Sequence, residues 1–398
     1  MKIEQFDLER GQSLWENLVD FNLSESGVHP VTLLDLAEMG MDLADLESTP
    51  LAYIQTNGSP ELRSSLASQY PGASEDHIEV TNGSSEANLL VAQTLLEPGD
   101  TVLVQTPNYL QVAGLALNLG ATVETFDLRQ ETDWEPDWQA FEEGLDKRPS
   151  LIYISHPNNP TGHLLSAESR ARIVAGAERV GAWLLADEVY RGAELDGEIS
   201  PTFWGTSDRV IVVGGLSKAY GIPGARLGWL VAPREVVAGC WALHDYTTIA
   251  PSALSDRIAR FAVEPRNQAR LFARARTYMV PNRELFREWV EELDGLLDYT
   301  EPRAGAYAFV RYGASVGSVE LCDSIRRRHS VLIVPGAWMG MEGFLRIGLG
   351  TPREALVEGL RRLKEELSRL SGSREWRRLA HRRPRVGASP SLGSSSPK

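Results

Sequence analysis

Short apolar runs alternate with amphipathic stretches from about Ile78 to Gly228. Runs that are hydrophobic without period-two alternation are typical of strands covered on both faces. Five such runs are present, at Thr101–Gln105, Leu151–Ser155, Trp183–Ala186, Val210–Val213 and Trp229–Ala232. The stretches between several of them, such as Ser166–Val180, have the apolar spacing of crossover helices. This pattern predicts an α/β fold with a mostly parallel central sheet.

The pattern changes after Pro251, where the chain becomes mainly helical up to Leu293. Shorter strands are predicted next, followed by a closing amphipathic helix; these lie at Ala306–Arg311, Val331–Val334, Phe344–Leu349 and Pro352–Leu370. We therefore expect a second, smaller α+β domain that the N-terminal segment completes. The expected division is 1–48 as the N-terminal segment joining the small domain, 49–265 as the large domain, 266–370 as the small domain and 371–398 as a disordered tail.

Composition is that of a globular protein, with 42% hydrophobic and 24% charged residues among 398. No apolar stretch approaches the roughly 18 residues needed to cross a bilayer, and the N-terminus lacks the apolar core of a signal peptide. Cys240 and Cys322 lie far apart without metal-ligand spacing. We expect a cytoplasmic protein with reduced thiols and no metal site.

The net charge of −14 is unevenly distributed. The segment from Ser371 to Lys398 carries six Arg and one Lys against a single Glu, so the rest of the chain is more acidic than the total. An acidic body argues against nucleic-acid binding, because phosphate contacts need clustered Lys and Arg. The tail ends in a Ser-, Gly- and Pro-rich run that cannot bury a core, which predicts disorder.

Candidate chemistry is concentrated after the predicted strands, where open parallel sheets bind ligands. The segment Gly214–Gly228 follows an apolar strand and contains Lys218 in a Gly-rich context, with Arg226 eight residues on. Most lysines in loops are ordinary surface residues. However, a lysine amine of lowered pKa forms a Schiff base with a carbonyl cofactor, and an arginine at this spacing is suited to holding a phosphate.

Three strings in this order carry a specific resemblance. Ser217-Lys218-Ala-Tyr-Gly-Ile-Pro-Gly-Ala-Arg226-Leu-Gly228 resembles the Ser-Lys-x-x-x-x-Pro-Gly-x-Arg-x-Gly signature of class I/II aminotransferases. Asn158-Asn159-Pro160-Thr161-Gly162 resembles the Asn-Pro-Thr-Gly loop of that family, and Asp187-Glu188-Val189-Tyr190 its Asp-Glu-x-Tyr strand end. The resemblance covers roughly Phe21 to Leu370. It implies a pyridoxal 5′-phosphate (PLP) enzyme of fold type I, in which helices sandwich the central sheet.

The resemblance also implies a role for each matching residue. Lys218 would hold PLP as a Schiff base, and the buried carboxylate of Asp187 would keep the pyridine nitrogen protonated. Tyr190 and Asn159 would hydrogen-bond the phenolic oxygen of the ring, and Tyr109 would stack on its face. For the substrate, Arg346 would grip the α-carboxylate, with Gly27 and Asn159 also contacting it.

The phosphate site is expected at Thr81–Ala87, where an apolar run ends and a helix begins. Backbone N–H groups at a helix N-terminus bind phosphate, so we assign Gly83, Ser84, Ser85, Ser217 and Arg226 to this site. Many relatives have Ser or Thr three residues before the lysine, whereas this chain has Gly215. Tyr53 matches a tyrosine that reaches the phosphate of a neighbouring subunit, which implies a homodimer with shared active sites.

The predicted reaction is transamination between an L-amino acid and a 2-oxo acid. An alternative keeps PLP but changes the outcome to a lyase, a decarboxylase or a cyclase acting on an arginine derivative. The segment Asn22–Pro30 favours this alternative, because it vaguely resembles the Ser-Gly-Val stretch of capreomycidine synthases and contains Glu25 and His29 as extra charged groups.

Two further alternatives lie outside PLP catalysis. A PLP-sensing transcriptional regulator on this fold would carry an N-terminal winged-helix module, but here the aminotransferase pattern begins within the first few tens of residues. The intact set of motif residues argues against a non-catalytic structural relative.

Overall fold

The computed structural model describes residues 3–313 and 316–371, and its main feature is an eight-stranded sheet in the order β2-β9-β8-β7-β6-β3-β4-β5. The strands are β2 (Ile78–Thr81), β3 (Thr101–Thr106), β4 (Thr122–Arg129), β5 (Glu135–Pro136), β6 (Leu151–Ser155), β7 (Trp183–Asp187), β8 (Val210–Gly215) and β9 (Gly228–Val231). Neighbours from β4 to β8 run parallel, whereas β9 is antiparallel to β8 and β2. The predicted mostly parallel α/β sheet is confirmed.

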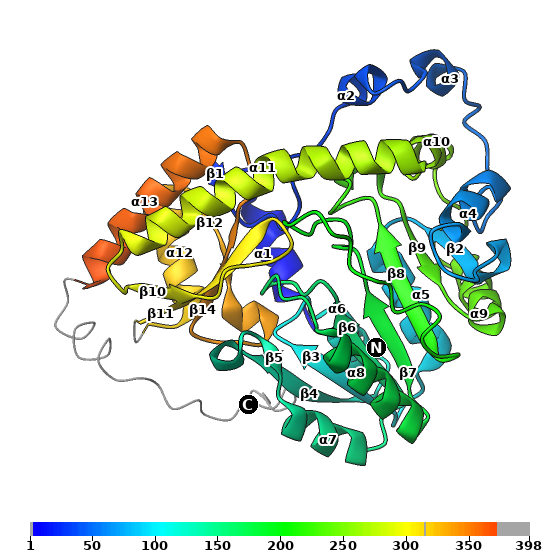
Figure 1. Ribbon diagram of the computed structural model, residues 1–398, viewed down its shortest axis with the longest axis horizontal. Coiled ribbons are helices and arrows are strands. Elements are labelled where there is room, and N and C mark those ends of the chain that lie inside the picture. The colour runs from blue at the N-terminus through cyan, green and yellow to red at the C-terminus, as the bar shows by residue number, and fades with distance from the viewer. Residues whose placement is uncertain (1–2, 314–315, 372–398) are drawn as a thin grey trace.

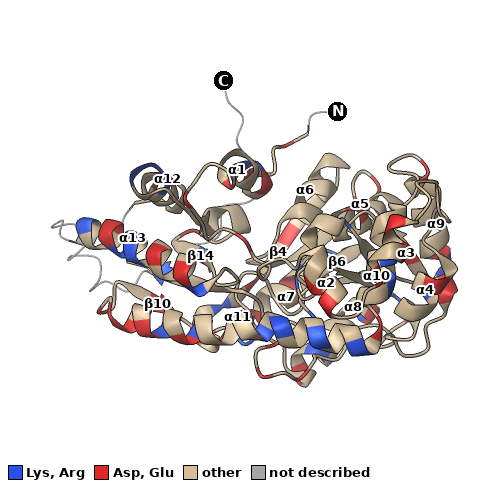
Figure 2. Cartoon of the chain, turned by 90° about the horizontal axis from the view of Figure 1, so that it is seen from above, with Lys and Arg blue, Asp and Glu red and all other residues tan. Residues whose placement is uncertain are grey.

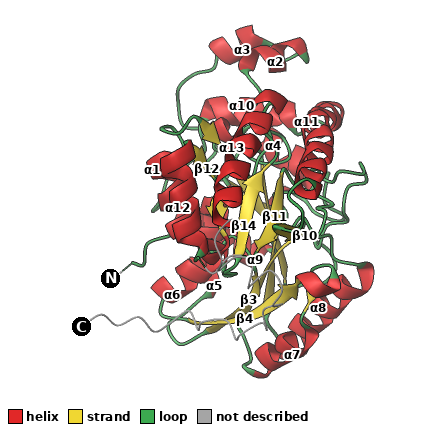
Figure 3. Cartoon of the chain, turned by 90° about the vertical axis from the view of Figure 1, so that its left-hand side faces the viewer, coloured by secondary structure: helices red, strands yellow, loops and turns green. Residues whose placement is uncertain are grey.

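Helices cover both faces of this sheet. Figure 3 shows α5 (Ser84–Leu95) and α6 (Gln111–Asn118) on one side, and α7 (Trp138–Asp146) and α8 (Ala167–Val180) on the other. The helix α9 (Arg234–His244) packs against α5. Four of the central strands are almost completely buried, as expected for a parallel sheet between helical layers.

The longest strand that the sequence pattern did not predict is β4, which does not have a continuous apolar run; the short strands β1 (Phe21–Asn22), β5 and β10 (Leu297–Tyr299) were not predicted either. The residues of β4 alternate between apolar and polar types, and Phe126 and Leu128 are the ones that it buries. This strand lies next to the edge strand β5, where a sheet is less fully covered. Uninterrupted apolar runs therefore do not predict this strand.

The C-terminal part forms a smaller antiparallel sheet in the order β10-β11-β14-β13. Its strands are β10 (Leu297–Tyr299), β11 (Tyr307–Tyr312), β13 (Val334–Pro335) and β14 (Phe344–Gly348). The N-terminal strand β1 (Phe21–Asn22) pairs in parallel with β12 (Val331–Leu332). The N-terminal segment thus packs with the C-terminal elements, and the domain boundaries given above stay a prediction.

Two helices, α10 (Ala253–Ala262) and α11 (Pro265–Glu291), occupy the Arg-rich stretch, and α11 crosses the molecule (Figure 1). Its first half contributes Leu271 and Phe272 to the core around the large sheet. Its second half contributes Phe286 and Trp289 to the core of the smaller sheet. This one rigid element therefore connects the two hydrophobic cores.

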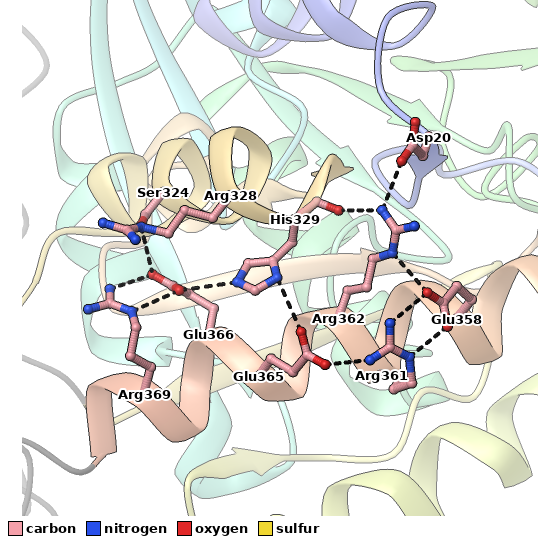
Figure 4. Close-up of polar contacts among 10 residues, drawn as sticks. All are labelled: Asp20, Ser324, Arg328, His329, Glu358, Arg361, Arg362, Glu365, Glu366 and Arg369. Atoms are coloured by element: carbon pink, nitrogen blue, oxygen red, sulfur yellow. Dashed lines mark hydrogen bonds and ion pairs between the residues drawn. The ribbon is translucent and has the colours of Figure 1, made fainter.

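The helices α12 (Ser318–His329) and α13 (Arg353–Ser371) cover the smaller sheet, and acidic and basic residues alternate along α13 (Figure 2). Glu366 is buried between them and accepts hydrogen bonds from Ser324, His329 and Arg369 (Figure 4).

The remaining α-helices are α1 (Asp7–Trp15), α2 (Leu33–Glu38), α3 (Leu43–Glu47) and α4 (Pro60–Ala67). Every helix within the described residues is too short or too polar to span a bilayer. The tail predicted to be disordered lies, beyond residue 371, outside the described residues.

Candidate active site

A cavity of about 290 Å³ lies where β6, β7 and β8 reach their carboxyl ends. Most of the predicted site residues line it, namely Ser84, Ser85, Tyr109, Asn159, Asp187, Tyr190, Ser217, Lys218, Arg226 and Arg346. Gly83 and Gly27 lie directly beside it, the first against Arg226 and the second against Ser217 and Lys218. Tyr53 does not line the cavity of its own chain, and 80% of its surface is exposed.

The amine of Lys218 meets a hydroxyl inside the cavity. Lys218 Nζ donates a hydrogen bond to Ser26 Oγ at 3.1 Å. Tyr190 Oη donates to the same oxygen at 2.8 Å, and burial raises the pKa of this phenol. Because Ser26 is 6% exposed, its hydroxyl holds the lysine and the tyrosine together in a site largely shielded from water.

Asp187, the last residue of β7, is a buried carboxylate with weak partners in the chain. Its Oδ1 accepts the Val189 N–H at 3.1 Å, and its Oδ2 accepts from Asn88 and Tyr153 at 3.4 Å each. Burial raises the pKa of Asp187, and among the described residues no cationic side chain forms an ion pair with it. A buried charge needs a partner, and a protonated pyridine nitrogen is the partner that PLP provides.

The N-terminus of α5 forms a cradle for an anion. Gly83 has φ +92°, and a β-carbon there would lie 2.5 Å from Arg226 Nη2. A β-carbon at Gly228 would lie 2.4 Å from the Ser84 nitrogen. Both positions require glycine, because the guanidinium and β9 approach the first turn of α5 closely. Free N–H groups, two serine hydroxyls and an arginine at one helix end suit a phosphate.

Crowding does not explain why this chain has Gly215 where many relatives have Ser or Thr. A β-carbon there would lie 3.6 Å from Ser84 Cβ and 3.5 Å from the Leu227 carbonyl oxygen, which are ordinary contacts. Ser217, whose Oγ is 3.5 Å from Arg226 Nη1, is the hydroxyl that the lysine segment itself contributes to this end of the cavity.

The guanidinium of Arg346 faces the cavity from β14 and is 1% exposed. Its Nη1 donates to Asn159 Oδ1 at 3.0 Å and its Nη2 to the Ser24 carbonyl at 2.6 Å. Within the part of the chain that the structure describes, its Nε has no hydrogen-bond partner. Burial lowers the pKa of Arg346, but a guanidinium keeps its charge in proteins. A buried, incompletely paired arginine is suited to a carboxylate ligand.

The N-terminal helix α1 lines one side of the cavity. Tyr109 Oη donates to Glu9 Oε1 at 2.8 Å, and burial raises the pKa of Tyr109 well above its ordinary value. Gln12 Nε2 donates to both the carbonyl and the hydroxyl of Ser24 at 3.0 Å. Ser24, whose carbonyl accepts a hydrogen bond from Arg346, is thereby connected to α1.

Several lining residues were not predicted from the sequence, and they are Glu9, Gln12, Glu16, Ser26, Asn88 and Tyr153. Only Ser26 belongs to a string noted in the sequence, the Ser-Gly-Val stretch within Asn22–Pro30. Of the two charged groups suggested in the segment Asn22–Pro30, Glu25 lines the cavity, whereas the ring of His29 packs 5.6 Å from that of Tyr278. Asn88 lies within α5 and Tyr153 in the middle of β6, so no strand-end signal marked them, although both contact Asp187.

A larger cavity of about 730 Å³ lies elsewhere, lined by His163, Glu135 and Arg303 among others. It contains no lysine and none of the predicted site residues. Chemistry rather than volume therefore identifies the smaller cavity as the candidate active site.

Comparison with known proteins agrees with this geometry. The family model for aminotransferase class I and II matches residues 20–363. Capreomycidine synthase from Streptomyces vinaceus is 34% identical over 351 residues, which cover 87% of this chain and 89% of that protein. A PLP-dependent aminotransferase from Streptococcus suis superposes with a TM-score of 0.86 at 31% identity, covering 94% of this chain and 100% of that chain. A PLP-dependent cyclase superposes with a TM-score of 0.85 at 27% identity, covering 93% and 98%.

Proposed function

Because the chain belongs to the aminotransferase class I and II family and uses PLP, we propose that it transfers an amino group between an L-amino acid and a 2-oxo acid. The observation that carries this proposal is one cavity in which Lys218, Asp187 and Arg346 converge from three separate elements. An amine, a buried carboxylate and a buried guanidinium match the three tasks of holding a carbonyl cofactor, keeping its ring protonated and binding a carboxylate.

Each residue has a task in this reaction. When bound, PLP supplies an electron sink that acidifies the α-hydrogen of the substrate. Arg346 binds the α-carboxylate, and Asn159 fixes the plane of the guanidinium. Lys218 is the general base that removes the α-proton and later delivers it, while the Ser26 hydroxyl orients its amine. Asp187 keeps the electron sink effective because its negative charge faces the cavity.

Replacing Lys218 with Ala tests the proposal directly. The variant should lose both the visible absorbance of lysine-bound cofactor and all turnover. Lys364, partly exposed on α13 and paired with Glu292, is the matched control, and Lys364→Ala should keep both. An unchanged cofactor spectrum in Lys218→Ala would remove the basis of the assignment.

A second candidate function, ring closure of an arginine derivative, is favoured by the charge of the cavity wall. Glu9, Glu16 and Glu25 line it, and none of them forms an ion pair with a described residue. Burial, and then repulsion from Glu25 and Glu9, raises the pKa of Glu16. Gathered carboxylates attract a cationic side chain such as a guanidinium. The likeness to capreomycidine synthase and to a PLP-dependent cyclase supports the same reading.

The two functions differ in their products. Incubation with L-arginine and its hydroxylated derivatives, followed by mass spectrometry, should yield more than one equivalent of 2-oxo acid per active site only when an acceptor 2-oxo acid is present. Release of ammonia or carbon dioxide, or formation of a cyclised product without an acceptor, would identify the second function instead.

A homodimer with shared active sites is part of the proposal, and three exposed side chains support it. Leu51, Tyr53 and Tyr246 are 86%, 80% and 90% exposed, and large apolar side chains left exposed on one chain are candidates for burial in an interface. The ion pair between Asp45 and Arg257 brings the segment that contains Tyr53 near α10. Mixing inactive Lys218→Ala chains with Tyr53→Ala chains should restore activity if each site uses Tyr53 of the other copy, and no recovery would contradict sharing.

A further inference from the structure

Beneath the phosphate cradle lies a buried charged cluster that the proposed reaction does not use. His244, the last residue of α9, is fully buried. Its Nδ1 lies 2.8 Å from Glu79 Oε1 on β2, and its Nε2 lies 3.5 Å from Glu86 Oε2 on α5. Both glutamates are buried as well. Two carboxylates facing one imidazole in the core are costly unless the imidazole carries a proton.

Glu86 connects this cluster to the cradle. Its Oε2 accepts the backbone N–H of Asn82 at 2.7 Å, the residue before Gly83. Gly83 is the N-cap of α5 and has no side chain with which to cap the helix. Glu86, in the third position of the helix, reaches back past the N-cap to the Asn82 N–H, one residue before the N–H that the acidic residue of a capping box contacts. The same carboxylate thus fixes the turn that presents the N–H groups to a phosphate.

The position of the Glu86 carboxylate creates an electrostatic conflict with a bound phosphate. A phosphate and the Glu86 carboxylate are both negative, and both lie at the N-terminus of α5, whose dipole attracts either one. Glu79, a second buried carboxyl on the inner side, adds less negative charge, because burial raises its pKa to about 7. A proton on His244 offsets this charge without occupying the cradle itself.

The hydrogen bonds of His244 agree with a protonated ring. Burial alone would lower its pKa, but the hydrogen bonds to Glu79 and Glu86 raise the pKa of His244 to about 9. Its Nε2 also lies 3.0 Å from Thr248 Oγ1, and Thr247 and Thr248 both donate to Glu86 Oε1. Both side-chain oxygens of Glu86 therefore accept hydrogen bonds, and these bonds fix the carboxylate beside the cradle.

We propose that His244 is a positioning residue for the cofactor. The positive charge of His244 neutralises the carboxylate of Glu86, so that the N-terminus of α5 can bind the phosphate of PLP. The inference rests on the proposed site, in which Gly83, Ser84 and Ser85 receive that phosphate. It assigns a role in phosphate binding to residues that do not touch the cofactor.

The test compares PLP with pyridoxal, which lacks the phosphate, on the full-length chain freed of cofactor. The ratio of the two affinities, measured by absorbance titration, reports the contribution of the phosphate alone. In His244→Gln this ratio should fall about tenfold or more, because uncompensated negative charge remains beneath the cradle. Adding Glu86→Gln to His244→Gln should recover most of the ratio, since the glutamine amide oxygen still accepts the Asn82 N–H without carrying charge.

The control is a second histidine that contacts a buried glutamate far from the cavity. His329 Nε2 lies 3.2 Å from Glu366 Oε2 between α12 and α13 (Figure 4), and His329→Gln should leave the affinity ratio unchanged. A ratio that His244→Gln does not lower, or that the added Glu86→Gln does not recover, overturns the inference. An equal loss of PLP and pyridoxal affinity also overturns it, because this indicates general destabilisation. A wild-type ratio near one contradicts the phosphate site itself.

Discussion

The amine of Lys218 donates a hydrogen bond to the hydroxyl of Ser26, a residue 192 positions earlier in the chain. Tyr190 donates to the same oxygen, so Ser26 accepts from both groups that the motifs assign to the cofactor. Because the hydroxyl is buried, neither donor can replace this acceptor with bulk water. The N-terminal segment therefore contributes directly to the geometry of the catalytic amine.

Replacing Ser26 with Ala should lower kcat by about tenfold, since one lost hydrogen bond between buried groups is worth about 1.5 kcal/mol. KM for the amino acid should change less, because Arg346 is untouched. Steady-state kinetics gives both values, and Ser65→Ala on the exposed side of α4 is a neutral control. If kcat and the visible spectrum of Ser26→Ala both match those of the wild type, Ser26 has no part in orienting the lysine.

Replacing Asp187 with Asn should lower kcat by about a hundredfold or more, because a preorganised charge that stabilises developing charge is lost. The change keeps the shape of the side chain and removes only its charge. Glu188 provides a matched control, because it is a buried carboxylate at the same strand end that contacts Phe203 N–H and Thr202 instead of the cavity. Glu188→Gln should lower the unfolding midpoint and leave kcat within about twofold. Equal kcat losses in the two variants would show that Asp187 acts through stability alone.

The motif residues could be predicted because each lies within a few positions of a strand end. The strand β6 has the predicted bounds Leu151–Ser155, and Asp187 ends β7 one residue beyond the predicted limit. Parallel strands end at a common edge of the sheet, so local strings translate into one shared cavity. Lys218, Asp187 and Asn159 were assigned from the three motif strings and line one cavity, while their roles stay a prediction.

The substrate side could not be predicted in the same way, because it depends on contacts between distant segments. Ser26 reaches Lys218 only because β1 pairs with β12, with Phe21 opposite Val331. Glu16, at the C-terminal end of α1, lines the cavity because α1 contacts the segment Gly336–Met339 and Tyr109. No local pattern encodes either contact. The alternation in β4 carried a strand signal, but that signal differs from the continuous apolar runs of the central strands.

A preference for cationic amino acids should follow from the acidic wall. In the variant Glu16→Gln with Glu25→Gln, KM for L-arginine should rise about threefold to tenfold, because each partly exposed ion pair contributes about 0.2–1 kcal/mol. KM for L-norleucine should not change. Added salt should raise KM for L-arginine more in the wild type than in the variant, and Asp7→Asn, on α1 but outside the cavity lining, is the control. A wild-type preference for L-glutamate over L-arginine would contradict this prediction.

The stability of the smaller sheet should depend on pH through Glu366. Hydrogen bonds from Arg369, and then from Ser324 and His329, lower the pKa of this buried carboxyl to about 2. A lowered carboxyl pKa adds stability above the unfolded value near 4.5, and the stability is lost as pH falls through about 2. Glu366→Gln should therefore lower the free energy of unfolding by about 1–3 kcal/mol at pH 7, with a shrinking difference from the wild type between pH 5 and pH 2.

Urea unfolding at pH 7, 5 and 3 measures this difference in the free energy of unfolding. The control is Glu365→Gln, at the exposed neighbour that pairs with Arg361, and it should differ from the wild type by less than about 0.5 kcal/mol. A difference that stays constant across these pH values would show that the charge of Glu366 does not contribute.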